Sequence, residues 1–275
     1  MTNAYADLTT LRSESWINIT KTDEDTRLRT QLEQVSRFID DLTGRFFYCW
    51  EGAMYFNGAG TTIYPEDILS VTTFKLDEDG DGTYEETIAT TDYVLYPLND
   101  TPKTWAEISS NSEYGGFASG IKKGVEINGV FGYGDGKSAS PYHDAGTDVN
   151  EGSGVTSTAV TITVDDGTQF AIAQTIRIDS EQIYIQSIST HVLTVKRGVN
   201  GTTAATHADD SDIDIYDYPE PIRTAVLIET TRLWKRKDEG FVTKVIGSSE
   251  TGILKVYDKL DPYTVQVVGR YRRYV

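Results

Sequence analysis

The chain has 275 residues, of which 38% are hydrophobic and 11% aromatic, enough apolar material to fold around a real core. Its formal net charge is -17, which disfavours general affinity for DNA or anionic membranes because both are themselves negative. The lone Cys49 excludes an intrachain disulfide. No apolar run approaches the roughly 18 residues that span a bilayer, and the first residues predict no secretion signal.

A helix is predicted from residue 23 to residue 43. Its apolar side chains recur at alternating spacings of four and three, which places them on one helix face: Leu28, Leu32, Val35, Ile39 and Leu42. Thr22 or Asp23 is expected to cap the start of the helix, and Gly44 to end it in a left-handed conformation.

Strand-like runs follow at residues 53–56, 68–76, 85–89 and 92–96. The loop between two of them carries Asp77, Asp79 and Asp81, whose spacing matches the opening of an EF-hand calcium loop. That motif needs a bidentate Glu at its twelfth position, where this chain has Ile88. We therefore favour a hairpin turn over a metal site, with these three aspartates as weak candidate ligands, and we predict no cofactor.

A strand is predicted at residues 125–133, and a Gly/Ser/Asp-rich linker at residues 134–154. Strict alternation then predicts about five short strands separated by polar turns. Their alternating residues are Val160, Ile162 and Val164, then Ile176 and Ile178, Ile183 and Ile185, Val192 and Val195, and Ile213 and Ile215. The sequence thus predicts an inserted β domain at 151–216, which divides a discontinuous core made of 1–150 and 217–275.

The last part returns to helix. Pro219 and Pro221 open a helix that Gly240 can end, residues 252–258 could be a strand or a short helical turn, and Pro262 opens a final helix towards Arg273. Taken together, the sequence predicts an α+β fold with a helical core, β-hairpin excursions and an inserted all-β barrel or sandwich.

The framework resembles the head-tail connector, or adaptor, proteins of long-tailed double-stranded DNA bacteriophages. The resemblance lies in the order and spacing of five segments: residues 38–46, 92–97, 125–133, 221–236 and 268–273. The insert resembles a small β module of phage tail and baseplate proteins. Its cues are Phe170, residues 176–179, Glu181, residues 193–198 and residues 201–207, although Asp209 and Asp210 stand where a Gly is expected.

The resemblance implies a structural virion protein, assembled in the host cytoplasm and located in the virion neck. Such a protein forms a homo-oligomeric ring, usually of twelve copies, below the portal, extends the DNA channel and docks the stopper or tail-completion protein. It implies that DNA passes through the lumen without specific binding and that no membrane is contacted. It also implies that the C-terminal segment contacts the portal, through Arg270, Tyr271, Arg272 and Arg273.

A second basic cluster gives candidate subunit-interface residues: Arg232, Trp234, Lys235 and Arg236. Their alternative interpretation is surface charge that suits the negative end of the helix dipole. For the C-terminal segment, the alternative is an exposed terminal helix with solvated charges.

Enzyme functions find little support, and we predict a protein that is not an enzyme. The three histidines, His143, His191 and His207, are far apart and lie in no zinc motif, and Lys137 lacks the glycine spacing of a phosphate-binding loop. Asp179 and Glu181 would lie on one face of a strand, but such carboxylate pairs arise by chance in so acidic a chain. The alternative function is a tail or baseplate adhesin whose β insert binds a host surface or a carbohydrate.

Overall fold

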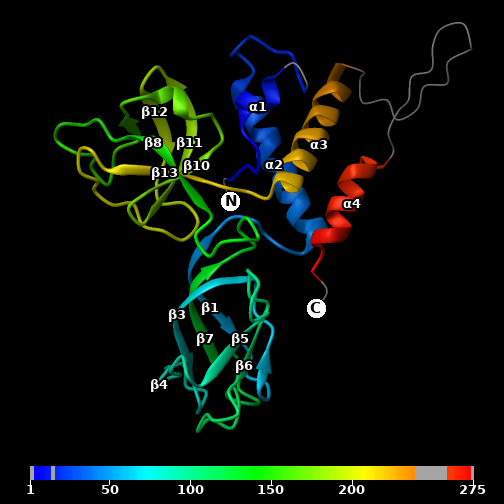
Figure 1. The fold of residues 1–275 in the computed structure, drawn as a ribbon, viewed down its shortest axis with the longest axis vertical. Coiled ribbons are helices and arrows are strands. Elements are labelled where there is room, and N and C mark those ends of the chain that lie inside the picture. The colour runs from blue at the N-terminus through cyan, green and yellow to red at the C-terminus, as the bar shows by residue number, and fades with distance from the viewer. Residues whose placement is uncertain (1–2, 14–15, 239–258, 274–275) are drawn as a thin grey trace, which may run out of the picture.

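The computed structural model describes residues 3–13, 16–238 and 259–273. Figure 1 shows three parts: a group of helices, a six-stranded sheet beside it, and a module of two smaller sheets below. Within the described residues, no helix is both long and apolar enough to cross a lipid bilayer.

The helices are α1 (Leu8–Arg12), α2 (Asp25–Thr43), α3 (Glu220–Asp238) and α4 (Pro262–Tyr271). The predicted apolar face of α2 is confirmed at Leu28, Leu32, Val35 and Ile39, which are buried in the cluster shared with the other helices. The fifth predicted residue, Leu42, is only partly buried. Gly44 ends α2 with φ 65°, as predicted.

The N-terminal ends of α2 and α4 are capped differently. The predicted N-terminal caps of α2 are wrong, because Glu24 occupies the cap position and makes no side-chain capping bond. By contrast, the Asp261 side chain caps α4 by accepting from the Tyr263 amide. The predicted stop at Gly240 and the element expected at residues 252–258 lie outside the described residues.

The lower module contains two sheets around one core. The four-stranded sheet has the order β1-β7-β3-β4, with β1 (Trp50–Phe56), β7 (Val125–Phe131), β3 (Ile68–Leu76) and β4 (Glu86–Thr87). The three-stranded sheet has the order β2-β6-β5, with β2 (Thr62–Ile63), β6 (Trp105–Ile108) and β5 (Tyr93–Tyr96). Both sheets turn apolar side chains onto a shared cluster that includes Phe74, Phe117 and Phe131.

The six-stranded sheet has the order β8-β13-β10-β11-β12-β9. Its strands are β8 (Tyr142–Asp148), β9 (Thr161–Thr163), β10 (Thr175–Ile178), β11 (Glu181–Ser189), β12 (Val192–Lys196) and β13 (Asp212–Tyr216), with a short 3-10 helix, η1 (Gly167–Gln169). The predicted strand positions are confirmed and most of their alternating residues are buried, but Val160 is 64% exposed.

Strand β8 lies in the predicted linker and before the predicted domain boundary at 151, so the linker prediction is wrong there. Its sequence has little strand propensity; it forms because its backbone pairs with β13, and this pairing cannot be read from residues 142–148 alone.

The prediction of a helical core is also wrong. Strands account for 30% of the described residues and helices for 22%, and the strands form three sheets. The hairpin excursions are in fact a module with a core of its own. Two of its strands, β2 and β6, are too short for their alternation to stand out in the sequence.

Candidate functional site

The C-terminal residues predicted to contact the portal divide into two pairs. Tyr271 is buried, with its ring centroid 5.7 Å from that of Phe47 and 5.3 Å from that of Tyr133. Arg273 forms an ion pair with Glu66 at 2.6 Å, and its backbone N–H donates to the Thr43 carbonyl at 2.8 Å. These two residues therefore anchor the end of α4 against α2 and the lower module.

Arg270 and Arg272 instead lie exposed at this anchored end. The Arg270 guanidinium lies 5.7 Å from the ring centroid of its neighbour Tyr271. Neither arginine forms an ion pair with any described residue. Arg236 is the one other described arginine without an ion pair. The remaining described arginines all pair with a carboxylate: Arg12, Arg27, Arg29, Arg37, Arg45, Arg177, Arg197, Arg223, Arg232 and Arg273.

The predicted subunit-interface cluster on α3 is mostly internal. Arg232 pairs with Glu229 at 3.0 Å and donates to the Lys259 carbonyl at 2.6 Å. Trp234 is buried in the helical core, and the Arg27 guanidinium lies 5.4 Å from its ring centroid. These two side chains hold the helices together.

Of the other two residues in that cluster, Lys235 is exposed and Arg236 is partly buried. Of the four residues predicted for this interface, Lys235 and Arg236 are therefore the two whose charge is not used in packing the helices.

The candidate metal loop lies between β3 and β4, with one oxygen of each of Asp77, Asp79 and Asp81 within 4.8 Å of the others. Asp77 is buried, and its two oxygens accept from the amides of Gly80 at 2.6 Å and Gly82 at 2.9 Å. Asp79 and Asp81 are exposed and each accept one backbone amide within the loop. The three carboxylates thus shape the turn. Ile88, at the twelfth position where an EF-hand loop has a metal-binding Glu, is buried in the core.

A buried ionic network joins Glu181, at the start of β11, to Arg197 and His207 in the six-stranded module. The Glu181 carboxylate, fully buried, accepts from Arg197 Nε at 2.7 Å and Nη2 at 2.6 Å, from the amides of Gly198 at 2.8 Å and Ala205 at 2.9 Å, and from His207 Nε2 at 2.9 Å. Burial would raise the pKa of Glu181, but these hydrogen bonds together lower it to about 2.

The opposite ring nitrogen of His207, Nδ1, lies 2.7 Å from the Asp179 carboxylate. Both ring nitrogens of His207 thus lie within hydrogen-bonding distance of carboxylate oxygens. In the sequence, Asp179 and Glu181 form a candidate catalytic carboxylate pair. In the structure they hold the loop 197–207 against β11.

That loop docks on the rest of the molecule. The Asn200 carbonyl accepts from the Glu51 amide at 2.8 Å, and the side-chain amide of Asn200 bonds to Asn3 and, at 2.9 Å, to Gln182. Gly201 follows with φ 90°, and a Cβ there would lie 1.9 Å from the Glu51 carbonyl oxygen. The junction of the N-terminal segment, β1 and the six-stranded module is therefore a buried amide network.

Apolar side chains complete this junction. Ala173, Tyr184 and Val199 from the six-stranded module belong to the same buried cluster as the helices. The Tyr184 hydroxyl donates to Glu33 on α2 at 2.9 Å. These residues pack the module against the helices, while most of its buried side chains form a separate cluster of their own.

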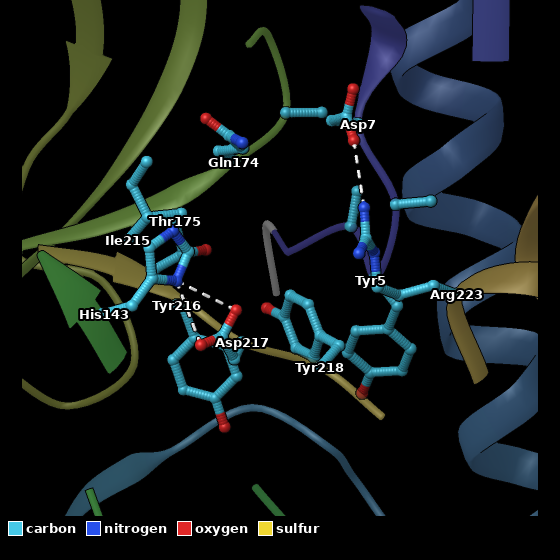
Figure 2. A pocket seen from close by; sticks show the side chains of 13 residues that line it. Tyr5, Asp7, His143, Gln174, Thr175, Ile215, Tyr216, Asp217, Tyr218 and Arg223 are labelled. Atoms are coloured by element: carbon cyan, nitrogen blue, oxygen red, sulfur yellow. Dashed lines mark hydrogen bonds and ion pairs between the residues drawn. The ribbon is translucent and has the colours of Figure 1, made fainter. Parts of the chain in front are cut away.

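A small pocket opens between the N-terminal segment, the six-stranded module and the start of α3 (Figure 2). On one side His143 Nδ1 lies 2.9 Å from Asp217, and on the other Arg223 lies 3.5 Å from Asp7. The pocket holds about 70 Å³, room for a few water molecules. Pockets for drug-sized ligands measure about 300–1,000 Å³, so this one does not suit a sugar or a nucleotide.

The sequence did not point to the residues of the amide junction. Asn3, Gln182 and Asn200 are far apart in the chain, and buried amides carry no spacing signal. The Gly that follows Asn200 was a signal for close backbone approach, since only glycine fits against Glu51.

Comparisons with known proteins add no relative. No protein-family model matches the chain, and no match was found among curated proteins or among solved structures.

Proposed function

We propose that this chain is a structural protein of a tailed bacteriophage, a head-tail connector of the virion neck. It would form a homo-oligomeric ring, of twelve copies in the resembling family, below the portal. There it would extend the DNA channel and dock the stopper or tail-completion protein. The proposal rests on the order and spacing of the connector-like segments along the chain, together with one feature of the α4 end.

That feature is the pair of unpaired arginines. In a chain of net charge -17, most described arginines pair with a carboxylate of the same molecule. Of the three that do not, Arg236 is partly buried, while Arg270 and Arg272 are exposed. Arginine is enriched among the residues that dominate protein interfaces. Because Tyr271 and Arg273 fix the end of α4, these two guanidinium groups are presented from a rigid base. This is the arrangement expected of a docking point for an acidic surface of the portal.

The acidic charge supports a second part of the proposal. Asp148 on β8 lies directly opposite Asp212 on β13, a like-charge pairing that destabilises a sheet. Desolvation and the nearby carboxylates of Asp212 and Asp165 raise the pKa of Asp148. An acidic face of this kind, if turned to the lumen, would repel DNA phosphates and let the genome pass without binding. A neck whose bore is lined with Lys and Arg would contradict this part.

A reconstruction of the unique vertex of the parent particle by cryo-electron microscopy, without imposed capsid symmetry, tests the proposal. We expect a closed ring of this chain directly beneath the portal, with α4 facing the portal. Density at the distal tail or its fibres would reject the connector function and favour the adhesin alternative.

A further inference from the structure

The small pocket between the N-terminal segment, the six-stranded module and the start of α3 contains a hydroxyl without a partner (Figure 2). The Tyr218 hydroxyl is buried there, and no described residue forms a hydrogen bond with it. Its polar neighbour Thr175 donates its own hydroxyl to Asn3 at 3.1 Å. Burial raises the pKa of Tyr218 well above its usual value, so the hydroxyl keeps its proton and can donate. Because a buried hydroxyl without a partner is costly, an acceptor in the pocket would be stabilising.

Two further side chains of the same pocket have unused donors. Arg223 donates from Nη1 to Glu220 at 3.0 Å, while its Nη2 lies 3.5 Å from Asp7 without a hydrogen bond. The side-chain oxygen of Gln174 accepts from the Ala171 amide at 2.8 Å, and no described residue accepts from its side-chain nitrogen. Figure 2 shows these two side chains and the buried hydroxyl on different sides of the pocket.

The carboxylates of the pocket, by contrast, already have donors. One Asp7 oxygen accepts from the Thr10 amide at 2.7 Å and the other from the Thr10 hydroxyl at 2.8 Å. Both Asp217 oxygens lie within 3.0 Å of His143 Nδ1. The pocket thus presents an excess of donors, so its ligand should offer acceptors and no donors, as an oxyanion does.

Size and charge narrow the class of oxyanion. The cavity of about 70 Å³ admits a group of a few heavy atoms. The carboxylates of Asp7 and Asp217 flank it, so a doubly charged phosphate is repelled more strongly than a singly charged carboxylate. The side chains of His143 and Arg223 are 54% and 36% exposed, so a ligand can enter from solvent.

We propose that this pocket binds a carboxylate group, held by Arg223, Tyr218 and Gln174. The planar guanidinium group suits a carboxylate, and the hydroxyl and the side-chain amide add donors from two other sides. Gln174 lies just before β10 and Arg223 lies on α3, so the bound group joins the six-stranded module to the helices. The carboxylate belongs either to a small free acid or to an acidic side chain of a partner, and the test separates these sources.

The test titrates the full-length, isotope-labelled protein with sodium acetate and follows its amide signals by NMR, with ionic strength held constant by sodium chloride. We expect saturable shifts around the pocket, with a dissociation constant in the millimolar range for so small a ligand. Tyr218→Phe, which removes only the hydroxyl, and Arg223→Gln should each weaken binding by roughly tenfold.

The matched control is Tyr142→Phe. The Tyr142 hydroxyl is also buried without a hydrogen-bond partner among the described residues, but it does not line the pocket, so its loss should leave acetate binding unchanged. Thermal unfolding checks that Tyr218→Phe and Arg223→Gln remain folded.

A second titration, with glutamate capped at both ends of its backbone, identifies the source of the carboxylate. Tighter binding than that of acetate indicates an acidic side chain of a partner, and equal or weaker binding indicates a small free acid. Acetate shifts that do not saturate, or that persist unchanged in both Tyr218→Phe and Arg223→Gln, would mean that the pocket holds water alone and would overturn the proposal. Tighter binding of phosphate than of acetate would overturn the choice of a carboxylate.

Discussion

Glu181 and Asp77 are both buried carboxylates that organise a loop, but they do so in different ways. Glu181 accepts from two backbone amides, forms an ion pair with Arg197 and hydrogen-bonds to His207. Its loop reaches residues 200–201, which dock on β1. Asp77 accepts from two amides within five residues and has no cation beside it among the described residues. The first carboxylate links distant segments, and the second shapes a local turn.

The difference teaches how a buried charge can be used. A carboxylate that accepts only from backbone amides of its own short loop affects little else when it is changed, because its hydrogen-bond partners are adjacent in the chain. A carboxylate that binds a buried arginine is coupled to distant structure, and removing it leaves an uncompensated charge in the interior.

The largest expected effect is that of Glu181→Gln. This change leaves the Arg197 guanidinium, only 7% exposed, without its counter-charge, so we expect a loss of about 3 kcal/mol or more in the free energy of unfolding. Urea denaturation followed by circular dichroism measures it. The control is Asp214→Asn, which breaks an ion pair with Arg177 of the same 2.6 Å length on the same sheet, with both groups about 30% exposed. There we expect less than about 1 kcal/mol. Equal losses in the two variants would contradict the comparison.

The lowered pKa of Glu181 predicts that the stability of the folded protein depends on pH. Because the pKa of Glu181 in the folded protein, about 2, lies below its ordinary value of 4.5, its contribution to stability is complete above pH 4.5 and is lost as the pH falls towards 2. The stability difference between the wild-type protein and Glu181→Gln should therefore shrink from pH 7 to pH 3. Parallel stability curves over this range would show that the carboxylate charge does not act as inferred.

A smaller effect is expected from Asn200→Gly, which tests whether the loop held by Glu181 docks through its amide. Glycine keeps the left-handed backbone, at φ 58° in the wild type, and removes only the side-chain bonds to Asn3 and Gln182. We expect a loss of about 2 kcal/mol, because Asn3 and Gln182 each lose a buried partner. The matched change Asn57→Gly removes one exposed bond to the Lys123 amide and should cost much less.

Asp77→Asn addresses the local turn. The side-chain nitrogen of asparagine cannot accept, so one of the amides of Gly80 and Gly82 loses its partner, at a cost of about 1–2 kcal/mol. Asp79→Asn keeps the acceptor of its single bond and should change the free energy of unfolding by less than about 0.5 kcal/mol. Added calcium should stabilise neither the wild-type protein nor the variants; a rise in melting temperature with calcium would revive the metal-site interpretation.

The smallest effects are expected at the end of α4. Arg270→Ala and Arg272→Ala should each leave the free energy of unfolding within about 0.5 kcal/mol of the wild type, because neither side chain has an ion-pair partner in the described structure. Arg273→Ala should cost about 1 kcal/mol or more through loss of its bonds to Glu66 and Pro65. If Arg270→Ala destabilises the protein as much as Arg273→Ala, the guanidinium serves the fold and the docking proposal loses its main support.

Local patterns predicted those elements whose signal lies in neighbouring residues. The four-three spacing of apolar residues predicted α2, Gly44 predicted its end, and alternation predicted the strands β9 to β13, because periodicity and turn chemistry are properties of short segments. From the same sequence, Tyr271 and Trp234 are predicted to lie on interaction surfaces. Both are buried, since aromatic residues at a helix end serve equally well for docking and for packing.

By itself the sequence determined the two long helices, the strands β9 to β13 and the excess of negative charge. Only the tertiary structure decided that β8 joins the six-stranded sheet, that Glu181 meets Arg197 and His207, and that Arg273 is paired while Arg270 and Arg272 are not. The physical reason is that periodicity records which face of an element is buried. Hydrogen bonds and ion pairs between distant residues depend on where the elements meet, and no local pattern encodes that.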